Sequence, residues 1–205
     1  MDVPFEVPVG DELAVRLSSV LEAVYLVFNE GYTATAGEQW ARAELCHEAM
    51  RLRRMVAALA PSESEAYALV ALMEIQASRL RARTGPDGEI ITLDKQDRAR
   101  WDRLLITHGL AALERAEELG GTGSYAIQAK IAACHARAPR AEDTDWAQIA
   151  SLYDDLVTLT RSPIVELNRA VAVSMADGPA AGLAVTDGLL DVAVLQLPPV
   201  AERVR

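Results

Sequence analysis

The stretch Leu21-Glu-Ala-Val-Tyr-Leu-Val-Phe-Asn-Glu-Gly-Tyr32 decides the fold class of this chain. Its apolar residues recur every three or four positions, which is the spacing of one face of an α-helix. Asp11 can cap the start of this helix, and Gly31 can end it. The sequence therefore predicts a helix over about 12–30 that runs into a polar string at 29–32.

Seven further segments show helical periodicity and begin or end at capping residues, Gly or Pro. They span about 38–59, 62–82, 97–119, 123–138, 145–160, 164–176 and 179–190. The third helix opens with Ser62-Glu-Ser-Glu65, a capping-box pattern. Its apolar residues spread around the whole helix, so we expect it to lie at the centre of the fold.

The helical pattern breaks once, over residues 84–93. Pro86-Asp87-Gly88 is turn chemistry, and the β-branched run 90–92 follows it. The sequence therefore predicts a short β-hairpin or extended loop at this point.

The last three predicted helices resemble tetratricopeptide repeats (TPR) in the spacing of their large and small residues. Small residues such as Ala170 and Gly182 allow paired helices to approach closely, and Gly178-Pro179 supplies a tight turn. The front half has no clean period. We expect an all-α fold: an irregular TPR-like array of about eight helices, with a simple helical bundle as the alternative.

Composition indicates a folded cytoplasmic protein. The 205 residues are 51% hydrophobic, which is enough for a large core, yet no apolar run is long enough to span a membrane. Residues 1–20 lack the pattern of a secretory signal. The two cysteines, Cys46 and Cys134, agree with a reducing compartment and are expected to be buried thiols.

The formal charge of −10 argues against contact with duplex DNA, which requires clustered Lys and Arg. Residues 1–41 and 141–205 each carry −6, and the middle of the chain carries +2. Arginines recur in that middle part near the ends of the predicted helices, where they complement helix C-termini. The alternative to this capping role is a docking face for an acidic partner. The arginines of this middle part are Arg51, Arg53, Arg54, Arg79, Arg81, Arg83, Arg98, Arg100 and Arg103.

We predict neither catalysis nor a bound metal or cofactor. Cys134 and His135 are adjacent on a helix and so point about 100° apart, while Asp143 or Asp145 suits the N-cap of a helix that begins at Trp146. None of the three histidines has a convincing nucleophile beside it, because Cys46 and Cys134 point away from the histidines that follow them. Glycine-rich nucleotide-binding motifs are also missing from the sequence.

Polar residues within the apolar helices are the candidate site. They form either a buried network that fixes the helices or the floor of a groove that binds a partner. These residues are Asn29, Glu30, Tyr32, Arg98, Trp101, Asp102, Gln128, His135 and Asp145.

Five motifs together resemble the C-terminal extension of one group of bacterial extracytoplasmic-function (ECF) sigma factors. They are Asn29-Glu-Gly-Tyr32, the segment 88–103, Ala132-Ala-Cys-His-Ala136, Glu142-Asp-Thr-Asp-Trp146 and Val165-Glu-Leu-Asn-Arg-Ala170. The resemblance covers roughly residues 4–190. It departs from the family at the end of the chain, where further repeat helices would be expected.

The resemblance implies a regulatory, protein-binding domain that acts in transcription initiation through its parent sigma factor. Residues 1–11 would be the linker from promoter-reading domains, 12–190 the TPR-like domain, and 191–205 a divergent tail. The expected partners are RNA polymerase or the promoter-reading domains of the same chain. Neither DNA nor membrane contact is expected, and a homodimer through 164–200 is a hypothesis. The alternatives are a free-standing adaptor, or a ligand sensor or enzyme that uses Arg98, Trp101 and His135.

Overall fold

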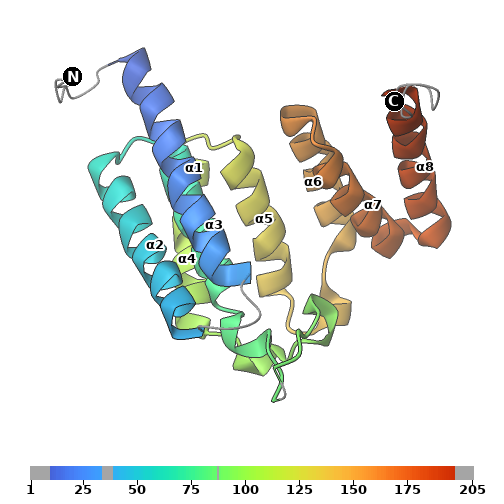
Figure 1. The fold of residues 1–205 in the computed structure, drawn as a ribbon, viewed down its shortest axis with the longest axis horizontal. Helices are drawn as coiled ribbons and strands as arrows, with labels where there is room; N and C mark the ends of the chain where they lie inside the picture. The colour runs from blue at the N-terminus through green and yellow to red at the C-terminus, as the bar shows by residue number, and fades with distance from the viewer. Residues whose placement is uncertain (1–9, 34–38, 87, 197–205) are drawn as a thin grey trace, which may run out of the picture. The chain divides into compact units, whose positions relative to one another are not determined.

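A computed structural model describes residues 10–33, 39–86 and 88–196, and the chain in these ranges is all-α (Figure 1). It folds as two compact units, residues 1–121 and 122–205. The class expected from the sequence is therefore confirmed. Residues 1–9 of the predicted linker and 197–205 of the predicted tail lie outside the described residues.

The described residues of the first unit form four α-helices and three short 3₁₀ turns. The helices are α1 (Asp11–Thr33), α2 (Gln39–Leu59), α3 (Ser64–Ala77) and α4 (Arg103–Glu118), and the turns are η1 (Leu80–Ala82), η2 (Leu93–Lys95) and η3 (Arg98–Arg100). Helix α3 packs against α4, α2 and α1. Ten of its fourteen residues are buried, so α3 is the core element of this unit, as its apolar sequence predicts.

The second unit contains α5 (Ser124–Arg137), the 3₁₀ turn η4 (Ala141–Asp143), α6 (Trp146–Thr160), α7 (Pro163–Asp177) and α8 (Pro179–Gln196). Each of these α-helices packs against the next one along the chain. Their buried core contains Ile127, Ile131, Cys134, Ile149, Leu156 and Ala172.

A close approach between α7 and α8 depends on Gly182. A Cβ atom at this position would lie 2.8 Å from the Ala170 carbonyl oxygen and 2.6 Å from the Ser174 Cβ. Glycine at 182 therefore sets how closely the two helices pack, as the sequence predicts for a paired-helix repeat.

The C-terminal end of α4 shows how a helix stop is encoded. Gly120 has a φ of +76°, a value that favours glycine. Its N–H donates to the Glu117 carbonyl, and the Gly121 N–H donates to the Ala116 carbonyl. These two bonds form a Schellman motif that ends the helix.

The predicted β-hairpin at 84–93 is wrong. The described residues of this segment contain one isolated antiparallel bridge, between Thr84 and Ile90, and no strand. The Ile91 N–H donates to the Arg83 carbonyl, and the Gly85 N–H donates to the Glu89 carbonyl. Residues 93–95 then turn into η2, which leaves the β-branched residues too few backbone partners for a ladder.

Two predicted helix starts are also corrected. The helix expected over 97–119 begins at Arg103, because the Asp97 and Asp102 side chains accept hydrogen bonds from nearby backbone N–H groups and stop the helix from extending backwards. The helix predicted to open at Ser62 starts instead at Ser64. Glu63 is the N-cap of α3 and makes no side-chain capping bond.

The eighth predicted helix is longer than expected, since α8 continues to Gln196 rather than ending near 190. No helix among the described residues has the length and apolar character that a membrane crossing requires.

Candidate functional site

The predicted site residues at the end of α1 are organised around Tyr32. Its ring stacks on Phe28 at a centroid distance of 5.3 Å. The Arg83 Cζ atom lies 3.8 Å from the centroid of the Tyr32 ring, and Arg83 Nη1 donates a 2.7 Å hydrogen bond to the Tyr32 carbonyl. Asn29 is half-buried and Glu30 is exposed. Tyr32 and Arg83 thus tie the end of α1 to the segment after η1.

A second group of predicted site residues lies just before α4. Trp101 is buried, with the Arg98 and Arg79 guanidinium carbons 5.0 and 6.0 Å from the centroid of its ring. The Asp102 N–H donates to the Ser78 carbonyl, and Asp102 Oδ1 accepts from the N–H groups of Leu104 and Leu105. The structure brings Arg98, Trp101 and Asp102 together at a turn that positions α4, which is a structural role.

The remaining predicted site residues belong to the second unit. His135 is buried on α5, and its ring lies edge-on to Trp146 at 5.2 Å and 76°. Asp145 is the N-cap of α6 and accepts a hydrogen bond from the Gln148 N–H. Gln128 is half-buried on α5. His135 and Asp145 therefore fix the two ends of the connection between α5 and α6.

Metal-ligating groups do not converge in the described part of the chain. No three His, Cys, Asp or Glu side chains there lie close enough together to hold an ion. Cys134 instead donates to Gln148 Oε1 at 3.2 Å. Burial raises the pKa of the Cys134 thiol, so the group is held in its protonated form.

Sequence reasoning missed a buried ion pair between α2 and α3. Arg53 and Glu74 are 0% and 2% exposed, and Arg53 Nη2 donates to Glu74 Oε1 at 2.9 Å. Arg54 Nη2 donates to the same oxygen at 3.0 Å, and His108 Nδ1 lies 3.8 Å from Oε2. Burial lowers the pKa of Arg53 to about 10, although the charge of Glu74 opposes the shift. The available signal was an acid, Glu74, in the middle of a helix whose apolar residues spread around its whole circumference.

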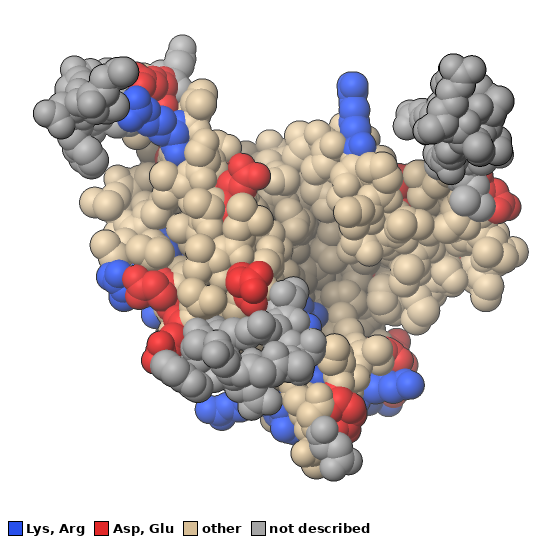
Figure 2. All heavy atoms as spheres, in the orientation of Figure 1, with Lys and Arg blue, Asp and Glu red and all other residues tan. Residues whose placement is uncertain are grey.

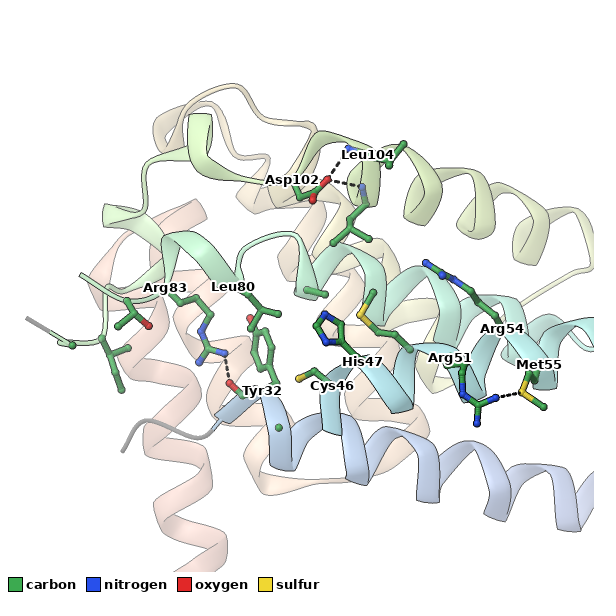
Figure 3. A pocket seen from close by; sticks show the side chains of 17 residues that line it. Tyr32, Cys46, His47, Arg51, Arg54, Met55, Leu80, Arg83, Asp102 and Leu104 are labelled. Atoms are coloured by element: carbon green, nitrogen blue, oxygen red, sulfur yellow. Dashed lines mark hydrogen bonds between the residues drawn. The ribbon is translucent and has the colours of Figure 1, made fainter. Parts of the chain in front are cut away.

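A pocket of about 800 Å³ opens in the first unit (Figure 3). Its walls come from the end of α1, one face of α2, the segment around η1 and the start of α4. Its lining combines apolar side chains with three arginines, Arg51, Arg54 and Arg83, and one acid, Asp102. Tyr32 and Asp102 are the predicted site residues that line this first-unit pocket.

Two comparisons with known proteins match this chain, and neither names an activity. Residues 16–117 match a family of unknown function (DUF6596), a range that falls within the first unit. The chain is 48% identical over 187 residues to the uncharacterized protein R00370 of Rhizobium meliloti (strain 1021). That match covers 91% of this chain and 44% of the relative, so the chain spans less than half of the relative's length. No solved structure matches the chain.

Proposed function

We propose that this chain is the regulatory C-terminal extension of an ECF sigma factor, acts in the cytoplasm by protein contact, and has no chemistry of its own. The ordered motifs at 29–32, 88–103, 132–136, 142–146 and 165–170 support this proposal. The Rhizobium relative is more than twice as long as its matched part, which leaves room in that protein for further domains.

We also propose that the second unit is a TPR-like array. Support comes from the packing of consecutive helices on one another and from the glycine-dependent contact between α7 and α8. In repeat arrays, each helix pair buries its apolar face against neighbouring pairs. An end of such an array is a natural place for a partner to bind.

An apolar stripe on α7 carries the proposal of a protein-contact role. Ile164, Leu167, Val171 and Met175 follow one another at helical spacing, and each is more than half exposed. Soluble monomers rarely leave such a patch uncovered unless it binds something. This α7 stripe fits an apolar protein surface, and we assign RNA polymerase as the partner.

The charges beside the α7 stripe argue against a nucleic acid as its ligand. Arg169 donates to Asp154 Oδ1 at 2.5 Å and to Glu166 Oε1 at 3.0 Å. The positive charge of the Arg169 guanidinium is therefore compensated by two carboxylates. Phosphate binding requires uncompensated basic groups.

A capture experiment with purified RNA polymerase tests the proposal. The bait is the chain fused to the residues that precede it in its parent protein, compared with the same bait carrying Val171→Glu. The matched control is Leu59→Glu on α2, because Leu59 is also an exposed apolar residue, at 82% exposure, but lies in the first unit. We expect capture by the wild-type and Leu59→Glu baits and its loss with Val171→Glu.

Two outcomes would overturn the proposal. If none of the three folded baits captures polymerase, the sigma-factor proposal is wrong. If all three capture it equally, the α7 stripe is not the contact surface.

Light scattering at high micromolar concentration tests the hypothesis of self-association through 164–200. A dimer that Val171→Glu converts to a monomer would assign the stripe to a second copy of the chain.

A further inference from the structure

The first-unit pocket has the size and openness of a small-molecule site. Its volume of about 800 Å³ lies within the range of about 300–1,000 Å³ that is typical of such sites. Figure 3 shows its labelled side chains on the end of α1, on α2, around η1 and at the start of α4. The whole lining belongs to one compact unit.

The charge of the lining is opposite to that of the chain. Among the described lining residues, three arginines stand against one acid, a formal charge of +2, whereas the whole chain carries −10. The acid is also compensated, because Asp102 accepts two N–H groups at the start of α4. Arg51 and Arg54 are paired with the carboxylates of Glu48 and Glu74, so the positive field that an anion meets in this pocket comes mainly from Arg83.

The three arginines differ in how far their donors are already used. Arg51 donates to both carboxylate oxygens of Glu48 and to the Met55 sulfur, and Arg54 donates twice to Glu74. Arg83 makes one hydrogen bond to the described residues, to the Tyr32 carbonyl. Since a guanidinium has five N–H donors in a fixed fork, Arg83 retains the donors that a carboxylate needs.

Arg83 is also held in place for this role. Its guanidinium lies across the Tyr32 ring, and that ring also stacks on Phe28, one turn earlier on α1. A cation fixed on an aromatic face loses little conformational freedom when it binds an anion.

Most of the remaining pocket wall is apolar, although His47 and Thr84 also line it. Leu80, Leu104 and Met55 are partly exposed, and Met50 and Leu105 complete this surface. Methionine side chains fit ligands of varied shape because they are unbranched and polarizable. A purely polar anion would leave this wall in contact with water, whereas an apolar body would cover it.

We propose that the first-unit pocket binds a small amphipathic carboxylate. Arg83 pairs with the carboxylate, and the apolar body lies against the methionines of α2 and the leucines at the start of α4. This inference does not rest on the proposed function, since binding is measured without polymerase.

Isothermal titration calorimetry of the full chain with decanoate tests the proposal. We expect saturable binding of one decanoate, and binding at least tenfold weaker for neutral decanol and cationic decylammonium. Arg83→Gln weakens decanoate binding about tenfold or more, because it removes a charge-assisted hydrogen bond. The matched control is Arg115→Gln, since Arg115 lies over Tyr67 in the same unit but outside the pocket.

A second pair of variants keeps the test valid if Arg83→Gln fails to fold. Leu104 lines the pocket, is exposed and lies in the first turn of α4, where either Gln or Glu is tolerated. Leu104→Glu weakens decanoate binding more than Leu104→Gln, because only Glu repels the carboxylate.

Methyl signals of the methionines locate the bound molecule. Met50 and Met55 line the pocket, whereas Met73 is buried in α3 and Met175 lies on α7. In methyl-labelled protein, decanoate shifts the first two signals and leaves the last two unchanged. Absent saturable binding, equal affinity for the three ligands, or equal losses in Arg83→Gln and Arg115→Gln would overturn the proposal.

Discussion

Arg53 Nη2 donates a 2.9 Å hydrogen bond to Glu74 Oε1 in the interior of the first unit. Both side chains are removed from solvent, so each charge depends on the other for stabilisation. The pair joins α2 to the core helix α3, with Arg54 and His108 near the same carboxylate.

Removing one partner of this pair is expected to destabilise the chain strongly. Arg53→Met leaves Glu74 with less compensation, at a cost of about 3–5 kcal/mol. The double variant Arg53→Met, Glu74→Leu recovers most of that loss, because no buried charge remains. Urea unfolding followed by circular dichroism measures both. Arg115→Gln, which breaks an exposed pair with Glu118, is the control and leaves the midpoint unchanged. Equal losses in the single and double variants would contradict this account.

The contact between α7 and α8 predicts opposite effects at two glycines of one helix. Gly182→Ala forces a Cβ against the Ala170 carbonyl and lowers stability by about 1–3 kcal/mol. Gly188→Ala meets nothing within 4 Å and raises stability by about 0.5–1 kcal/mol through helix propensity. Thermal unfolding of the two variants checks the signs. A stabilising Gly182→Ala would show that the helices have room to move apart.

Buried thiols predict a loss of stability in mild alkali. Burial raises the pKa of Cys46 and Cys134 above the ordinary value of 9.0, and Arg83 partly opposes the shift at Cys46. The folded chain then keeps protons that the unfolded chain releases. This contribution is complete below pH 9.0 and is lost as pH rises through the folded-state pKa values.

The variant Cys46→Ala, Cys134→Ala is expected to lose less stability than the wild type between pH 9.0 and 10.0. Above that window Tyr153 begins to contribute, because burial raises its pKa from 10.0. Urea midpoints measured at several pH values give the slope of stability against pH for the wild type and for the variant. Parallel slopes would mean that the thiols titrate alike in the folded and unfolded chain.

The N-cap of α4 predicts a graded response at Asp102. Asp102→Ala removes the acceptor for the Leu104 and Leu105 N–H groups and costs about 1 kcal/mol. Asp102→Asn retains an acceptor oxygen and costs less. Chemical unfolding ranks the three proteins, and equal midpoints for Ala and Asn would argue that the cap contributes nothing.

Local sequence signals predicted the helices well, because helix starts and stops depend on residues close in the chain. The sequence places an N-cap before Trp146, and Asp145 occupies that position. Pro61 similarly predicts the end of α2, which stops at Leu59. The failures at 84–93 and 97–102 arose where side chains such as Asp97 and Asp102 compete for the backbone, which periodicity does not register.

The candidate site was predicted less well, because it depends on contacts between distant residues. Tyr32 and Arg83 are 51 positions apart, and Arg53 and Glu74 are 21 apart. No local pattern links such pairs. Trp101 and His135, which were chosen from the sequence, are buried side chains at helix connections.

The burial of α3 has a consequence for how the first unit opens. A helix that water barely reaches can exchange its amide hydrogens only when the surrounding helices separate, so α3 reports on opening of the whole unit. Its substitutions are confined to those that keep side-chain volume. Variants that change the lining of the first-unit pocket can therefore be placed on α2, near η1 and at the start of α4, where they leave the interior of α3 unchanged.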